Sequence, residues 1–235
     1  MSMYKKITAI ILALAALLSL AACGSSTAPE QSAAPAQENT AQENAAQEMR
    51  IVTDTWGRKV EIPYTVESII CLGSGAPRMA AYLDVVDMMV GGEDHDKEAY
   101  NILRDYNPVY RDEIKDLPAV GSGGGSGANN GYAEEIITVA PDVILAGFSA
   151  EAADELYGQT GIPVVCVRYL SRNFVDESFY DAMRVFAEVV GAQERCESVL
   201  SFIDECKQDL NDRTKDIPDS DKQKVYTGAV TFSGR

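Results

Sequence analysis

The stretch VESIICLGSGAPRMAAYLDVVDMMVGG, residues 66–92, decides the fold class of this 235-residue chain. Two short apolar runs, at residues 68–72 and 88–92, flank a segment that begins at Pro77 and carries apolar residues at helical spacing. Continuous apolar runs of this length are typical of strands buried on both faces, and proline is favoured in the first turn of a helix. The stretch therefore predicts a strand, a helix and a second strand, the repeating unit of a parallel sheet.

The same alternation continues along the chain. Further strands are predicted at residues 142–147 and 163–169, and helices at residues 132–140 and 152–161. Ahead of the first strand, residues 50–63 predict a hairpin that turns at Trp56-Gly57-Arg58. Together these elements predict an α/β lobe with a parallel sheet over residues 49–175.

Residues 176–217 predict a helical spine. Apolar side chains from Phe179 to Val190 follow the helical period, Gly191 interrupts it, and a second segment continues to about Lys215. The second segment is acidic on its other face, which suits a helix that leaves the lobe. Residues 224–232, KVYTGAVTF, predict a strand, and we expect residues 218–235 to begin a second α/β lobe that would supply its partners.

The first 22 residues predict a secretory signal. Lys5 and Lys6 precede an apolar run of about 14 residues, shorter than the roughly 20 that span a bilayer as a helix. The tetrad Leu20-Ala21-Ala22-Cys23 resembles the bacterial lipobox, which implies that Cys23 carries a lipid. Residues 24–48 hold no large apolar residue before Met49, so residues 23–48 are predicted to form a disordered tether.

Charge and cysteine content exclude several classes of protein. The chain has 20 Lys and Arg against 36 Asp and Glu, a net charge of −16, so nucleic acid is excluded as a partner. Cys196 and Cys206 are ten residues apart on a predicted helix. That spacing is about 15 Å, whereas disulfides need Cα atoms within about 7 Å. Cys71 and Cys166 lie in predicted strands, and we expect free thiols.

The order of these segments resembles one family, the substrate-binding proteins of ABC importers for iron–siderophore complexes, haem and cobalamin. The resemblance covers about residues 50–235 and rests on the opening stretch together with VTDTWGRKVEIP, EEIITVAPDVILAG, TGIPVVCV and RVFAEVVGAQERCESVLSFI. It implies two α/β lobes joined by a long helix. Only the first lobe, the spine and the first strand of the second lobe are predicted here, so we expect a truncated or split gene.

The resemblance also implies a function. The protein is expected to be a lipid-anchored, extracytoplasmic binding protein, monomeric and not an enzyme, with no cofactor of its own. Its ligand would be an iron chelate, such as a siderophore or haem, or a cobalamin-like tetrapyrrole. Its partners would be an ABC permease and the permease's ATPase.

Ligands of this family bind between the lobes, at loops that follow the carboxyl ends of strands. Ser74 and Gly75 offer backbone N–H groups at a helix start. Arg168 offers a guanidinium for chelate carboxylates, and Tyr169 a phenol for stacking or an iron bond. The predicted ligand-binding residues are Ser74, Gly75, Arg78, Asn130, Tyr132, Phe148, Arg168 and Tyr169.

An acidic residue on the helix before Pro141-Asp142 matches the family's permease-docking position. In this sequence that residue is Glu134, with Glu135 beside it. The alternative interpretation is a plain solvated helix face.

The glycine-rich stretch VGSGGGSGANNGY, residues 120–132, invites a phosphate-binding interpretation. A phosphate loop needs a lysine, and no lysine lies between Lys115 and Lys207. The relaxed pattern G-x-G-x-x-A occurs at Gly123, Gly125 and Ala128, but no strand is predicted before it. We therefore expect a loop at the rim of the ligand cleft, with a flexible surface loop that touches no ligand as the alternative.

Two alternative functions, metal-ion import and hydrolysis, would both depend on His95, which is the single histidine of the chain. Importers of bare zinc or manganese bind the metal through several histidines with carboxylates, and one histidine falls short of that set. A hydrolase would need His95 with Ser74 or Ser126, neither of which lies in a G-x-S-x-G motif. Both remain alternatives to chelate binding.

Overall fold

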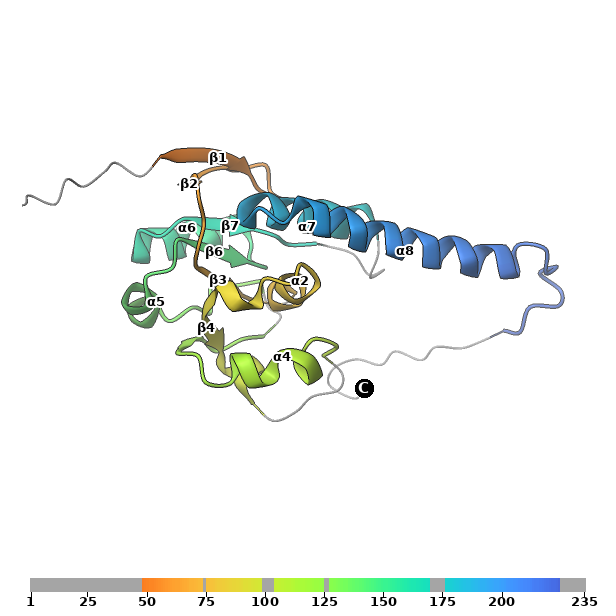
Figure 1. Cartoon of the computed structure of the whole chain (residues 1–235), viewed down its shortest axis with the longest axis horizontal. Helices are drawn as coiled ribbons and strands as arrows, with labels where there is room; N and C mark the ends of the chain where they lie inside the picture. Colours follow the sequence, from red (N-terminus) through yellow and green to blue (C-terminus); the bar gives the residue numbers. More distant parts are fainter. Residues whose placement is uncertain (1–47, 74, 99–103, 125–126, 170–175, 225–235) are drawn as a thin grey trace, which may run out of the picture. The chain divides into compact units, whose positions relative to one another are not determined.

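The computed structural model describes residues 48–73, 75–98, 104–124, 127–169 and 176–224. Its centre is a five-stranded, wholly parallel sheet with the strand order β5-β4-β3-β6-β7 (Figure 1). The strands are β3 (Ile69–Leu72), β4 (Met89–Glu93), β5 (Ala119–Gly121), β6 (Val143–Ala146) and β7 (Val164–Cys166). The α/β class predicted from the sequence is confirmed.

Successive residues of each strand point to opposite faces of the sheet, and each face has its own core. Ile69 and Cys71 of β3 belong to one buried cluster, whereas Ile70 and Leu72 belong to the other. The first cluster packs against α2 (Ala76–Tyr82), α4 (Asn107–Ile114) and α7 (Glu177–Val190). The second packs against α5 (Ala133–Val139) and α6 (Ala150–Thr160).

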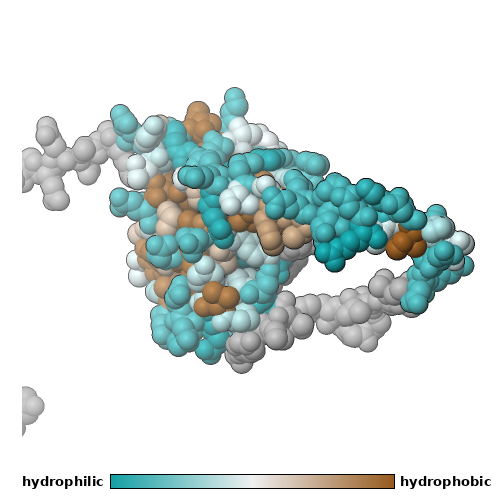
Figure 2. All heavy atoms as spheres, turned by 45° about the vertical axis from the view of Figure 1, so that its right-hand side comes forward, coloured by the Kyte–Doolittle hydropathy of each residue, from teal (hydrophilic) through white to brown (hydrophobic). Residues whose placement is uncertain are grey.

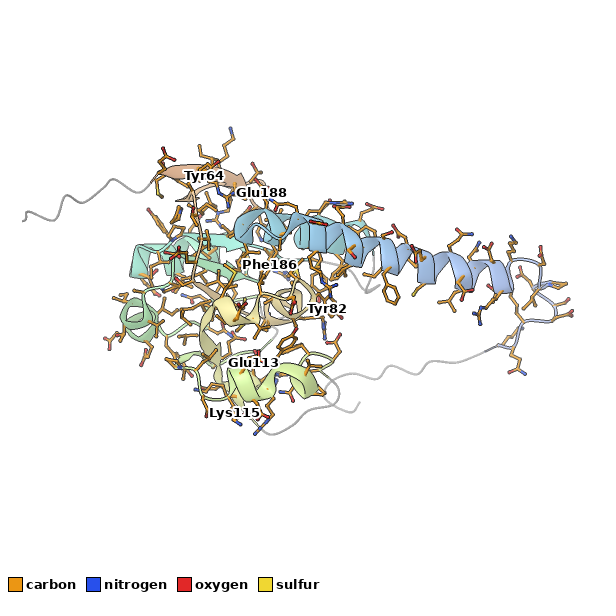
Figure 3. The ribbon with its side chains drawn as sticks, viewed as in Figure 1. Tyr64, Tyr82, Glu113, Lys115, Phe186 and Glu188 are labelled. Carbon is orange, nitrogen blue, oxygen red and sulfur yellow. The ribbon has the colours of Figure 1, made fainter. Side chains whose placement is uncertain are left out.

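The hairpin consists of β1 (Met49–Thr53) and β2 (Lys59–Pro63), which pair antiparallel as a separate two-stranded sheet. Arg50 fastens it to α7, because its Nη2 donates to the carbonyls of Glu188 and Val189 at 2.9 Å each. Arg50 Nε also donates to the carbonyl of Tyr64 at 3.1 Å. Figure 3 labels Tyr64 and Glu188 at this junction, and also Phe186, which lies two residues before Glu188 on α7.

The predicted spine is formed by two helices. Asp176 caps α7 by accepting the backbone N–H groups of Ser178 and Phe179, and Gly191 ends α7 in a left-handed conformation. The next helix, α8 (Gln193–Thr214), buries only Cys196 and Leu200, and residues 204–224 are exposed throughout. In Figure 2 the surface along α8 is mainly hydrophilic.

Some elements of the structure were not predicted from the sequence, and some predicted segments lie outside the described residues. β5 was not predicted, because its apolar run is too short, so the pattern at Gly123, Gly125 and Ala128 does follow a strand. The short helices α3 (Asp94–Lys97) and α4, and the 3-10 turn η1 (Val86–Met88), were also missed. The predicted signal, the tether up to residue 47 and all but the first residue of the strand at 224–232 lie outside the described residues.

Two further findings concern the described residues. None of the helices there combines the length and apolar character that a membrane span requires. Cys71, Cys166, Cys196 and Cys206 are free cysteines, as predicted, and the first three are buried.

Candidate functional site

The candidate site is the surface at the carboxyl edge of the parallel sheet. Gly73 follows β3, Glu93 ends β4, Gly147 follows β6 and Val167 follows β7, so four connections emerge along one edge. The edge is tied together across strands, because Gly147 N donates to the Leu72 carbonyl at 2.8 Å. We call this surface the strand-end surface. Ligands of open α/β sheets bind at such an edge.

Arg168 lies on this surface beside the hairpin turn. Its backbone N–H donates to Thr55 Oγ1 at 3.1 Å, and its guanidinium carbon lies 5.7 Å from the centre of the Trp56 ring. Trp56 is fixed in turn, because its Nε1 donates to the carbonyl of Phe148 at 2.9 Å. The Arg168 guanidinium is therefore held by an aromatic face, a contact that leaves its N–H groups able to meet an anion.

A glycine makes room for Arg168. A Cβ atom at Gly127 would lie 2.8 Å from Arg168 Nη1, and Gly127 has a φ of +70°. The Gly127 carbonyl accepts from Ser149 N at 2.8 Å. The glycine-rich stretch thus lies directly against a predicted ligand residue.

Tyr169 packs over the start of α2. A Cβ atom at Gly75 would lie 2.8 Å from the Tyr169 ring and 2.9 Å from its hydroxyl. Arg78 Nη1 donates to the Tyr169 hydroxyl at 3.3 Å, and the ring meets Phe179 edge-on at 5.3 Å. Both Tyr169 and Arg78 are half-buried.

Asp105 organises the same group of side chains. Its carboxylate accepts from Arg78 Nε at 2.9 Å and from the hydroxyl of Tyr82, which Figure 3 labels on α2. These hydrogen bonds and the charge of Arg78 hold the pKa of Asp105 below its usual value, although burial opposes them. Arg78 is thus already paired with a carboxylate.

Asn130 and Tyr132 end the glycine-rich stretch. The stretch closes on itself through an isolated antiparallel bridge between Gly121 and Gly131, with Ser122 N donating to the Asn130 carbonyl at 3.1 Å. The Tyr132 hydroxyl donates to Asp94 Oδ2 at 2.7 Å. Asn130 Oδ1 is buried and has no hydrogen-bond partner among the described residues.

Glu93 was missed by sequence reasoning, although the loop that it begins was expected near the ligand. It is 3% exposed, and its Oε1 accepts from the Gly73 backbone N–H at 2.7 Å. Burial raises its pKa to about 7, while hydrogen bonds from Gly73 and Asn130 pull the pKa down. The pattern that could have revealed it is the acid at the end of an apolar strand, MMVGGE.

A second buried acid, Asp96, lies nearby on α3. It accepts from Arg104 Nη1 at 2.5 Å and from the Tyr106 hydroxyl at 2.6 Å. Burial raises the pKa of Asp96, and Asp96 together with burial raises that of Tyr106. This cluster braces the β4 side of the strand-end surface.

The remaining predicted residues lie elsewhere or outside the description. The Phe148 side chain is 1% exposed and packs in the core with Leu156, so it presents its backbone rather than its ring. Glu134 is exposed in the first turn of α5, away from the buried core. Ser74 and Cys23 lie outside the described residues.

The groups that the two alternative functions would need are only partly described. His95 Nδ1 lies 3.6 Å from Glu98 Oε2. Within the described ranges, no three His, Cys, Asp or Glu side chains are gathered as metal ligands would be. Ser74 and Ser126, the serines considered for a hydrolase, lie outside those ranges.

A surface cavity of about 410 Å³ adjoins Arg168 on the side covered by α7. Its lining includes Thr55, Arg168, Asp181 and Arg184. Arg168 therefore borders both this cavity and the strand-end surface.

Comparison with known proteins gives the family. The family model described as periplasmic binding protein matches residues 69–229. A search of curated proteins found no match. Among solved structures, MolA of Haemophilus influenzae, bound to molybdate, has a TM-score of 0.58 and 19% identity, covering 73% of this chain and 56% of its own.

Two further structures have the same fold. A periplasmic solute binding protein from Veillonella parvula gives a TM-score of 0.56 at 18% identity, covering 73% of this chain and 50% of its own. The petrobactin-binding protein YclQ of Bacillus subtilis gives 0.53 at 12% identity, covering 72% and 54%. The chain thus spans about half the length of these structures, and by its fold and its family match it belongs to the periplasmic binding protein family.

Proposed function

We propose that this protein is the solute-binding component of an ABC importer and that it captures an anionic iron chelate, such as a ferric siderophore or haem, on the strand-end surface. A cobalamin-like ligand is the neighbouring possibility within the same class. The protein binds and delivers its ligand without chemical change. The observation that carries the proposal is the position of Arg168 and Tyr169, which follow β7 at the edge where the glycine-rich stretch also ends.

The two side chains offer different chemistry. Among the described residues no carboxylate forms an ion pair with Arg168, whereas Arg78 is paired with Asp105. Arg168 is thus the guanidinium available to a carboxylate or phenolate oxygen of a chelate. Tyr169 presents an aromatic face and a hydroxyl, which suit the flat rings of catecholates or tetrapyrroles.

The similar structures share the fold with this chain, but their own ligands differ. MolA is bound to molybdate and YclQ is a petrobactin-binding protein, and both share this fold at low identity. Ligand choice within one fold is set by side chains at the site. Molybdate therefore belongs in any binding test of this chain beside the chelates.

Location and partners complete the proposal. We propose that residues 1–22 are removed, that Cys23 is lipidated and that residues 23–48 tether the lobe outside the cytoplasmic membrane, where the protein acts as a monomer. Residues 49–175 would form the first lobe, 176–217 the spine and 218–235 the start of a second lobe. Glu134, exposed at the first turn of α5, is proposed to dock on an arginine of the permease.

Trp56 provides the test. It is the only tryptophan, and its ring lies 5.7 Å from the Arg168 guanidinium carbon. The detergent-solubilised full chain would be titrated with ferric hydroxamate and catecholate chelates, haem, cobalamin, molybdate and zinc, with Trp56 fluorescence and equilibrium dialysis read together. We expect saturable binding of one chelate, and binding of zinc alone, or of nothing by a folded chain, would overturn the proposal.

Variants locate the site. Arg168→Gln and Tyr169→Phe are expected to weaken binding of the same chelate by about tenfold each. Tyr64→Phe is the matched control, because Tyr64 is 63% exposed on the hairpin. If Arg168→Gln and Tyr169→Phe bind the chelate with the same affinity as Tyr64→Phe, the ligand binds elsewhere.

A further inference from the structure

Glu93 is a buried ionisable residue at the strand-end surface. It is 3% exposed, and its carboxyl group reaches across the edge of the sheet, where Oε1 accepts from the Gly73 backbone N–H at 2.7 Å. The Asn130 side chain lies close enough to this carboxyl group to lower its pKa. One side chain thus connects the end of β4 with the loop after β3 and with the glycine-rich stretch.

The glycine-rich stretch is shaped to lie against Glu93. Gly123 has a φ of +78°, and a Cβ atom there would lie 2.5 Å from His95 Cβ and 3.4 Å from Glu93 Oε2. No other residue fits this position without displacing the start of α3. The close approach at Gly123 is therefore part of the same junction.

The other end of the stretch meets a different part of the surface. Gly127 lies against the Arg168 guanidinium, and its carbonyl accepts from Ser149 N. The described parts of the stretch are thus held near Glu93 at Gly123 and Asn130 and near Arg168 at Gly127. A substitution at Glu93 can therefore displace the residues proposed to contact the ligand, although Glu93 itself does not contact the ligand.

We propose that Glu93 is a positioning residue, whose carboxyl group fastens the glycine-rich stretch to the loop after β3 and so fixes Asn130 and Tyr132 for ligand contact. The part of this proposal that concerns ligand contact rests on the proposed function. The fastening of the glycine-rich stretch does not rest on it, because the fastening can be measured on the protein without any ligand.

The protonation state of Glu93 gives the junction a pH dependence. Burial raises its pKa to about 7, so a closed junction holds the proton more tightly than one opened to water. By linkage, opening is favoured as pH rises from 6 to 8. The charged and titratable groups around Glu93 are Asp96, which raises its pKa, Arg104, which lowers it, and Cys71, Tyr132 and His95 on the adjoining elements.

Amide hydrogen exchange at residue resolution tests the fastening. The three informative amides are those of Gly73, Ser122 and Tyr132, which donate to Glu93, to the Asn130 carbonyl and to the Val120 carbonyl. In Glu93→Ala we expect all three to exchange about tenfold faster, the equivalent of one lost hydrogen bond. Glu93→Gln, which keeps an oxygen for Gly73, should stay near the wild-type rates at pH 6, and Glu61→Gln on the exposed face of β2 is the matched control.

The pH profile separates positioning from plain core packing. After correction for intrinsic exchange, opening in the wild type should increase between pH 6 and pH 8, whereas Glu93→Gln should show no such increase. Wild-type rates in Glu93→Ala would overturn the inference. If Glu93→Ala does not fold, the inference is tested by Glu93→Gln alone. A pH profile in Glu93→Gln that is the same as in the wild type would then overturn the inference.

Ligand binding forms a separate arm. If a chelate binds the wild type, Glu93→Ala should weaken it about tenfold while Glu93→Gln retains affinity at pH 6. If none of the probes binds but the exchange results hold, the proposed function fails and the fastening stands. If a chelate binds and Glu93→Ala changes neither exchange nor affinity, the fastening fails and the proposed function stands.

Discussion

The hydroxyl of Tyr169 accepts a hydrogen bond from Arg78 Nη1 at 3.3 Å, although the two residues are 91 positions apart in the sequence. Arg78 is held by Asp105, so the orientation of Tyr169 depends on residues from two other connections. A phenol fixed in this way loses little side-chain entropy when it meets a ligand, which is the advantage of a preorganised site.

Replacing Arg78 by Lys should disturb Tyr169 without unfolding the lobe. Lysine cannot donate to Asp105 and Tyr169 at once in the geometry of a guanidinium. We expect a fall in chelate affinity of about threefold to tenfold, with the midpoint of thermal unfolding little changed. Arg111→Lys on α4 is the control, and equal effects of the two substitutions would contradict the role of Arg78.

Gly75→Ala should destabilise the protein through contact with Tyr169. Gly75 has a φ of +95° and its Cβ would lie 2.8 Å from the Tyr169 ring, whereas Gly57, with a φ of +75°, has open space around it. We expect Gly57→Ala to lower the free energy of unfolding by about 1 kcal/mol and Gly75→Ala by about 2–3 kcal/mol. Urea denaturation measures both, and adding Tyr169→Ala should narrow the difference between them.

Asp54 should be essential for docking the hairpin. Its side chain is fully buried and accepts from the backbone N–H groups of Trp56 and Arg58, from Arg58 Nη1 at 3.0 Å and from Cys166 N at 3.3 Å. We expect Asp54→Ala to lower the free energy of unfolding by roughly 3 kcal/mol, because several donors lose their acceptor. Glu61→Ala is the exposed control, and the same small effect at both positions would refute the prediction.

Glu93 should make the lobe less stable as pH rises. Its pKa is about 7 in the folded protein against an ordinary value of 4.5, so the folded state binds the proton more tightly. Stability is then fully present below pH 4.5 and is lost as pH rises through 7, by on the order of 3 kcal/mol. Chemical denaturation at several pH values should show this decline in the wild type and a flatter profile in Glu93→Gln, and identical profiles would contradict it.

Glu134→Lys should impair delivery but not capture. Glu134 is exposed in the first turn of α5 and is not one of the proposed ligand contacts, so we expect reversal of its charge to leave the core and the affinity for the chelate little changed. With the permease and ATPase reconstituted, we expect lower stimulation of ATP hydrolysis at the same chelate affinity. Glu135→Lys is the neighbouring control, and the two should differ if Glu134 makes the specific contact.

The correct and the missed predictions have different physical origins. Four strands of the sheet were predicted because both faces of each are buried, which leaves a continuous apolar run in the sequence. β5 (Ala119–Gly121) escaped because its apolar run is only Ala119-Val120 before the glycines begin, whereas β7, an edge strand of the same length, lies within the longer apolar run PVVCV. β5 is held in the sheet by hydrogen bonds to β4, and the local sequence around residues 119–121 does not reveal these hydrogen bonds.

For the candidate site, the sequence predicts which residues follow a strand, but not how their side chains are oriented or buried. Arg168 and Tyr169 were predicted from their place at the end of a strand. Phe148 shared that place, yet its ring turns into the core because residues alternate between the two faces of the sheet. Glu93 was missed because an acid at the end of a strand is usually solvated, and only the packing of α3 and the glycine-rich stretch around it removes the water.

The sequence by itself determined the α/β class, the hairpin, the helical spine and the family, because these follow from short-range apolar periodicity and from turn residues. The tertiary structure alone decided which side chains meet: Tyr169 with Arg78, Gly127 with Arg168, and Glu93 with Gly73 and Asn130. The physical reason is that burial, hydrogen bonding and pKa depend on groups brought together from distant positions. A local sequence pattern does not contain these properties, because they arise only when the folded sheet brings its strand ends together.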